Sequence, residues 1–183
     1  RDPVQATYTH GETVTLTAVP TTGYSFSSWS GDITGTAASV TITMNSNKSV
    51  AAGFTINSYT LNTSATNGSI TKTPNQGTYT HGETVTLQAV PAEGYNFVNW
   101  SVDLAGSANP ATLVMDSNKT VAAAFAANTY TLQTSATNGS VTRTPDRASY
   151  THGETVTLTA VPATGYSFSS WSGDITGTAA SVT

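Results

Sequence analysis

The sequence predicts an all-β protein, built as a tandem array of small modules of the β-grasp-like or β-sandwich-like kind. Apolar and polar residues alternate along short segments rich in valine and threonine, and no window shows apolar residues at helical spacing. The whole pattern also returns every 71 residues, as the positions of Trp29, Trp100 and Trp171 show. These two observations together indicate repeated β modules with about six short strands each.

The constant period divides the chain into three parts. Residues 1–56 are a partial repeat that lacks its first strand, 57–127 are a complete repeat, and 128–183 are a partial repeat that lacks its last strand. The segment YTHGETVTL begins at positions 8, 79 and 150, with no insertion or deletion between the copies. We therefore expect the chain to be a portion of a longer array.

In the complete copy, the first predicted strand covers 58–65 and places Tyr59 and Leu61 on one face. Asn67-Gly68 follows and predicts a type I′ hairpin, because both central positions of that turn need a positive φ. The strand after this turn, within 69–74, is expected to pair back on the first.

Four more strands complete the copy, each with alternate residues facing inward. The strand within 82–90 ends at Pro91, since proline cannot donate to a central ladder. The predicted inward residues of the four strands are Val85, Leu87 and Ala89; Tyr95 and Phe97; Leu113 and Met115; and Val121, Ala123 and Phe125.

The composition excludes several classes of function. Charged residues make up only 9% and the net charge is -4, so neither nucleic acid nor an anionic membrane is an expected partner. The chain has 0 cysteines, which excludes disulfides and thiolate metal sites. No apolar run approaches the ~20 residues of a membrane span. Serine and threonine together make up roughly a third of the chain, a surface composition typical of secreted proteins.

The segment GYSFSSWSGD at 23–32 returns unchanged at 165–174, and as GYNFVNWSVD at 94–103. Our main interpretation is that these aromatic residues form the core of each module. The alternative is an exposed platform for sugar rings, in which Trp29, Trp100 and Trp171 contact the ligand. Trp100 reaches the same core as Phe97 only if the strand bulges or ends at Asn99. The predicted core aromatics are Tyr24, Phe26, Trp29, Tyr95, Phe97, Trp100, Tyr166, Phe168, Trp171, Phe54 and Phe125.

Other polar residues recur once in each copy, and we interpret them as structural. The histidines of YTHGE lie in a turn before a strand, and a single histidine per repeat is too few ligands for a metal. The aspartates after the tryptophans are expected to cap their own turns, because their loops hold too few acids for calcium. Lysines next to asparagine have the wrong geometry for a Lys–Asn crosslink. These residues are His10, His81 and His152; Asp32, Asp103 and Asp174; and Lys48 and Lys119.

The combined motif resembles the divergent internalin-B-type B-repeats (InlB B-repeats, also called Listeria–Bacteroides repeats). G-E-T-V-T-L-x-A-x-P precedes G-Y-x-F-x-x-W, and D-S-N-K-x-V-x-A-x-F follows it, so that the resemblance covers the whole chain. The resemblance implies β-grasp-like modules in tandem on exported bacterial surface proteins, where they act as spacers, stalks or adhesive arms. It brings no catalytic residues. This chain differs from helix-containing members, since no helical segment is evident between the second and third strands.

We therefore expect a non-enzymatic spacer or stalk in a secreted or cell-surface bacterial protein, with neighbouring repeats as its partners and no cofactor or metal. Two alternatives stay open. One is an extracellular filament, in which chains exchange strands through the incomplete first and last copies. The other is a module that binds a surface glycan or a host protein through its aromatic residues. An exposed aromatic patch would favour this last alternative.

Overall fold

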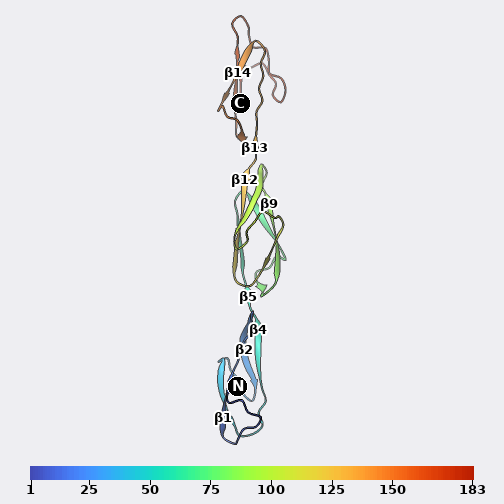
Figure 1. Ribbon diagram of the computed structural model, residues 1–183. Coiled ribbons are helices and arrows are strands. Elements are labelled where there is room, and N and C mark those ends of the chain that lie inside the picture. The colour runs from blue at the N-terminus through green and yellow to red at the C-terminus, as the bar shows by residue number, and fades with distance from the viewer. The chain divides into compact units, whose positions relative to one another are not determined.

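The computed structural model describes residues 1–183 and contains strands and turns but no helix (Figure 1). The prediction of an all-β chain made of small repeated sheets is confirmed. It follows that the structure contains no helix able to cross a membrane.

The strands form in every copy at the segments where valine and threonine alternate with polar residues. Their bounds are β1 Glu12–Thr17, β2 Tyr24–Gly31, β3 Ser39–Met44, β4 Val50–Ile56, β5 Ser58–Tyr59, β6 Leu61–Ala65, β7 Gly68–Thr73, β8 Tyr79–Thr80, β9 Thr84–Pro91, β10 Tyr95–Val102, β11 Ala111–Val114, β12 Lys119–Ala127, β13 Thr129–Tyr130, β14 Gly139–Thr144, β15 Tyr150–Thr151, β16 Thr157–Pro162 and β17 Ser181–Val182.

The middle repeat contains six longer strands and two strands of 2 residues each, β5 and β8. The longer strands form two three-stranded sheets, with the orders β10-β12-β6 and β11-β9-β7. Strands β5 and β8 pair with each other and place Tyr59 opposite Tyr79. The six expected strands are all present, and the two short ones are additional.

The core of this repeat takes side chains from both sheets. Val85 and Leu87 of β9 and Val121 of β12 are 0% exposed, and Leu113 of β11 is 8% exposed. Alternation along β9 is as predicted, because Thr84 and Gln88 are exposed whereas Val85, Leu87 and Ala89 are buried. Burial of apolar side chains stabilises the repeat by about 1.5–3 kcal/mol for each large residue.

The predicted hairpin at Asn67-Gly68 is wrong. Strands β6 and β7 belong to different sheets, and β7 pairs with β9 instead. Asn67 has a φ of 64°, but Gly68 does not have the positive φ that a type I′ turn requires. Gly68 serves close packing instead, since a Cβ there would lie 2.6 Å from the ring of Phe125 and 2.7 Å from the carbonyl oxygen of Val90.

The first and third copies contain parts of the same arrangement. In the first copy β1 pairs with β3, and β2 pairs with β4. In the third copy β14 pairs with β16, β16 with β17, and β13 with β15. Residues 166–170, the counterpart of β2, form no strand, because the sequence holds no counterpart of β4 to pair with them.

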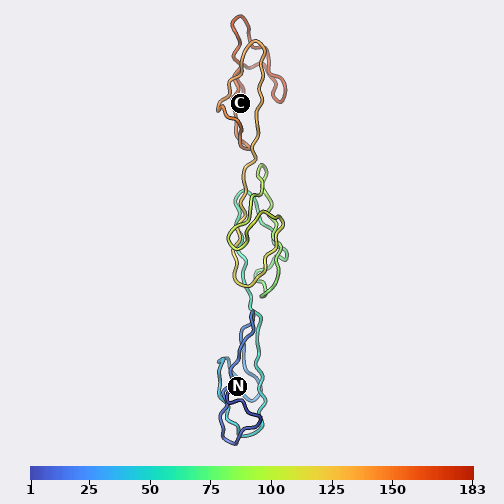
Figure 2. Tube along the Cα trace, in the orientation of Figure 1, coloured from blue at the N-terminus to red at the C-terminus, as the bar shows by residue number.

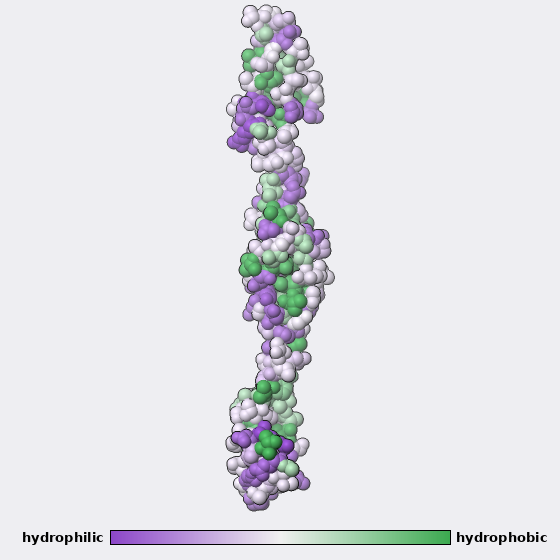
Figure 3. All heavy atoms as spheres, viewed as in Figure 1, coloured by the Kyte–Doolittle hydropathy of each residue, from purple (hydrophilic) through white to green (hydrophobic).

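Contacts divide the chain into two compact units, and each unit contains one crossing from a repeat to the next. The first unit comprises 1–64, 70–88 and 100–122, and the second comprises 65–69, 89–99 and 123–183. The Cα trace in Figure 2 shows a single segment of chain connecting successive repeats. On the face viewed in Figure 3, hydrophobic residues form small patches separated by polar ones, rather than one broad apolar surface.

Candidate functional site

The tryptophans of the aromatic motif lie in the interior of the first two copies. Trp29 is 7% exposed and Trp100 is 1% exposed. Their indole Nε1–H groups donate to the carbonyl oxygens of Ala37 at 2.9 Å and Ala108 at 2.8 Å. Trp171 in the third copy makes the equivalent bond but is only half-buried. In the first two copies the indole therefore does not present a face on which a sugar ring could stack.

A bulge brings the tryptophan to the same side as the phenylalanine. In the first copy the register of β2 with β4 shifts between Phe26 and Ser28, so Trp29 and Phe26 face the same core although they are three residues apart. Their ring centroids lie 5.2 Å apart, and Phe26 meets Phe54 edge-on at 5.9 Å. The bulge that the spacing requires is present in this strand.

Three of the predicted core aromatics are exposed, which corrects the expectation. Tyr24 is 43% exposed, Tyr166 is 58% exposed and Phe54 is 40% exposed. Phe125, the counterpart of Phe54, is half-buried because the turn at Gly68 packs against its ring. The first copy holds no residues equivalent to that turn, and Phe54 is therefore left uncovered.

The other aromatic residues of the motif are partly covered. Phe26, Tyr95, Phe97 and Phe168 are all half-buried, and Phe97 meets the ring of Phe125 at 5.9 Å. In the third copy Phe168 lies 5.0 Å from Trp171. The motif thus forms one aromatic cluster in each copy, and the degree of burial depends on which strands cover it.

The histidines lie in turns, and two of them also contact the preceding repeat. His81 packs over Gly23, and His152 packs over Gly94. His81 is half-buried, whereas His10 and His152 are both exposed. No group of three or more histidine, aspartate or glutamate side chains is placed to hold a metal ion.

The same turns contain a bonding pattern that sequence reasoning missed. Glu83 Oε2 accepts hydrogen bonds from the backbone N–H of Thr80 at 3.0 Å and from its hydroxyl at 3.3 Å. Tyr79 is 1% exposed, and its hydroxyl donates to the carbonyl oxygen of Pro74 at 2.9 Å. The signal was present in the repeated letters Y-T-H-G-E, which place Glu three residues after Thr, as in a capping box.

The aspartates do not cap their own turns as expected. Asp32 Oδ2 accepts from the backbone N–H of Ser49 at 2.6 Å, and Asp103 Oδ2 accepts from that of Thr120 at 2.7 Å. Both partners lie 17 residues further along, beside or within the strand that pairs with the tryptophan strand. These carboxylates therefore fix the start of β4 and of β12.

Lys119 forms a surface ion pair with Asp116 at 2.7 Å. The hydrogen bond between the two side chains lowers the pKa of Asp116 and raises that of Lys119. The backbone N–H of Lys119 donates to the carbonyl oxygen of Thr60 at 2.9 Å. The bonds of Lys119 thus hold the turn before β12, and its ammonium group is engaged with a carboxylate.

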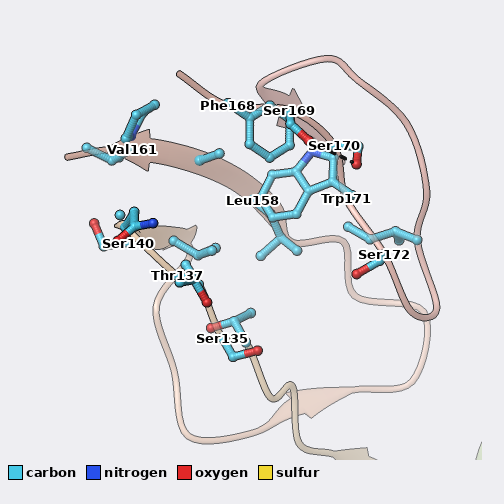
Figure 4. Close-up of a pocket in the computed structure, with 18 of the residues that line it drawn as sticks. Ser135, Thr137, Ser140, Leu158, Val161, Phe168, Ser169, Ser170, Trp171 and Ser172 are labelled. Atoms are coloured by element: carbon cyan, nitrogen blue, oxygen red, sulfur yellow. Dashed lines mark hydrogen bonds between the residues drawn. The ribbon is translucent and has the colours of Figure 1, made fainter. Parts of the chain in front are cut away.

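The third copy contains a groove of about 610 Å³. Two stretches of chain, 132–141 and 166–172, form its sides, and residues of β16 complete it. Figure 4 shows the rings of Phe168 and Trp171 beside Leu158, with Ser135 and Thr137 across from them. The groove therefore combines an aromatic wall with a wall of small hydroxyl side chains.

The position of this groove corresponds to that of a strand in the middle repeat. There β12 lies between β10 and β6. The counterparts of β10 and β6 in the third copy are 166–173 and 132–136, which are the two sides of the groove.

Comparison with known families identifies the chain. A family model described as the divergent InlB B-repeat domain matches residues 3–58, 59–129 and 130–183. The protein belongs to this family. Searches of curated proteins and of solved structures each gave no match.

Membership indicates a structural repeat of a bacterial surface protein and an extracellular location. Repeats of this family are generally not enzymes. The sequence-based identification of the family, and of the all-β tandem architecture, is confirmed.

Proposed function

We propose that these divergent InlB B-repeats act as a spacer, holding another part of a bacterial surface protein at a distance from the cell. The observation that carries this proposal is the length of the connection between repeats. Strand β4 ends at Ile56 and β5 begins at Ser58, so that only Asn57 separates them. Likewise, only Asn128 separates β12 from β13.

Neither asparagine is a free hinge. The backbone N–H of Asn57 donates to the carbonyl oxygen of Gly23 at 2.8 Å, and its own carbonyl accepts from the N–H of His81 at 2.9 Å. Both soft dihedrals of this residue are therefore restrained on each side. A spacer requires connections of this kind, because a flexible linker lets its ends approach each other.

Small-angle scattering of the 183-residue chain tests the spacer function. We expect the profile of an elongated particle. The control is a variant with about ten Gly-Ser residues inserted after Asn57, which should show a broader distribution of distances. A compact globular profile for the unmodified chain would contradict the spacer function.

A further inference from the structure

The contact between successive repeats uses the same three residue types at both crossings. In the first crossing, the imidazole of His81 lies against Gly23, where a Cβ atom would overlap the ring. In the second, His152 lies against Gly94 in the same way. Each histidine comes from the THGE turn of the following repeat, and each glycine comes immediately before the aromatic strand of the preceding one.

An asparagine completes the contact at both places. Asn128 donates its N–H to the carbonyl oxygen of Gly94 at 2.7 Å and accepts from the N–H of His152 at 2.9 Å. These bonds match those of Asn57 at the first crossing. The asparagine side chains are also held, since Asn57 Oδ1 accepts from Ser25 Oγ at 2.6 Å and the amide groups of Asn96 and Asn128 are bonded to each other.

The ring of the histidine contributes packing rather than polar bonds at the first crossing. His81 Nδ1 is buried and has no hydrogen-bond partner. The ring meets Tyr59 edge-on, with a centroid separation of 6.0 Å. The second crossing repeats this contact, with Tyr130 and His152 at 6.2 Å. A flat ring can lie this close to the backbone only where the facing residue has no side chain.

The chain also contains the same residues without their partners. His10 occupies the THGE turn of the first copy and lies against no glycine. Gly165 precedes the aromatic segment of the third copy and has a φ of +86°, and a Cβ atom added there would meet nothing within 4 Å. Glycine is thus required at position 23 for two reasons. Its φ is +82°, a positive value like that of Gly165, and the imidazole of His81 leaves no room for a side chain there.

We propose that this Gly–Asn–His contact is a coupling interface, which protects the junction between successive repeats from local unfolding. The inference deepens the proposed spacer function and rests on it. In a linear array, stability is the sum of the repeats and their nearest-neighbour contacts. The contact is specific, because it requires glycine on one repeat and histidine on the next.

Amide hydrogen exchange measured by NMR tests the coupling, because the N–H of Asn128 lies within the contact. Gly94→Ala and His152→Ala should each raise exchange at Asn128 by roughly tenfold or more. Exchange at Asn57, which belongs to the other crossing, should stay unchanged. Amides of Val85 and Leu87 in the core of the middle repeat should also stay protected, showing that the repeat is folded.

The chain supplies matched controls for both substitutions. Gly165→Ala imposes the same positive-φ strain without a ring above it. His10→Ala removes the same side chain, which is exposed in both copies, from a turn where it meets no glycine. Neither should change exchange at Asn128. The coupling is refuted if Gly94→Ala and His152→Ala leave Asn128 as protected as these controls do. If the coupling is refuted but the scattering profile is elongated, the spacer function still holds. A compact scattering profile would contradict the spacer function whatever the exchange at Asn128.

Discussion

Replacing Trp100 by alanine should largely destroy the stability of the middle repeat. The side chain is 1% exposed and is among the largest of the fully buried residues. Its removal leaves a cavity in a core whose other members include Val85 and Leu87. The substitution also removes the indole bond to the carbonyl oxygen of Ala108. Both the cavity and the lost hydrogen bond therefore reduce the free energy of unfolding, by different amounts.

The cavity term dominates. Truncation of a buried tryptophan to alanine costs about 3–5 kcal/mol. The lost hydrogen bond adds about 1 kcal/mol at most, since Ala108 is exposed and water can replace the donor. At about 0.05–0.15 kcal/mol per residue, a repeat of 71 residues has a free energy of unfolding of roughly 4–10 kcal/mol. The substitution thus removes about half of it or more.

Urea denaturation followed by circular dichroism measures this loss, and hydrogen exchange shows which repeat is affected. Trp171→Ala is the matched control, because this tryptophan has the same indole bond but is half-buried beside the groove. We expect the control to cost about 1–2 kcal/mol. Equal effects of the two substitutions, or an unchanged denaturation midpoint for Trp100→Ala, would refute the assignment of this residue to the core.

Three further predictions concern the turns. Tyr79→Phe should cost about 1–2 kcal/mol, measured by urea denaturation, because it leaves the carbonyl oxygen of Pro74 without its donor; no loss would show that water takes the donor's place. Asp103→Ala should raise hydrogen exchange at Thr120 and leave exchange at Ser49 unchanged, and equal exchange in both would mean that the carboxylate does not fix β12. The hydrogen bond from the backbone N–H of Thr9 lowers the pKa of Glu12. The ionised carboxylate of Glu12 therefore contributes to the stability of the fold above about pH 4.5, and this contribution is lost as the pH falls through the lowered pKa. The difference in melting temperature between the unmodified chain and Glu12→Gln should therefore shrink on acidification, and a constant difference would contradict this.

The sequence predicted the strands well and their pairing less well. Alternation along 84–89 was sufficient to identify the buried face of β9, because that pattern is local. The Asn67-Gly68 signal failed since it is also local, whereas the sheet that β7 joins is decided by distant packing. The ring of Phe125, which requires the glycine, is more than 50 residues away in the chain.

Burial of the aromatic residues could be predicted only in part, for a related reason. The first and third copies have the same motif, yet Trp29 is buried and Trp171 is half-buried. The difference arises from β4, which covers the motif in the first copy and has no counterpart in the third. A local sequence sets which residues can enter a core, and neighbouring strands decide whether they are covered.

The THGE turn explains how a single short motif can serve both a repeat and the contact between repeats. In the first copy, Glu12 Oε2 accepts from the N–H of Thr9 at 2.9 Å, as Glu83 Oε2 accepts from that of Thr80, although His10 lies against no glycine. The turn therefore forms without the contact, and its shape does not depend on the neighbouring repeat. Because the backbone that carries the imidazole is already ordered, docking against a glycine costs little further conformational entropy. Because of this preorganisation, a small contact can couple one repeat to the next. A flexible loop of the same composition would lose more conformational entropy on making the same contact.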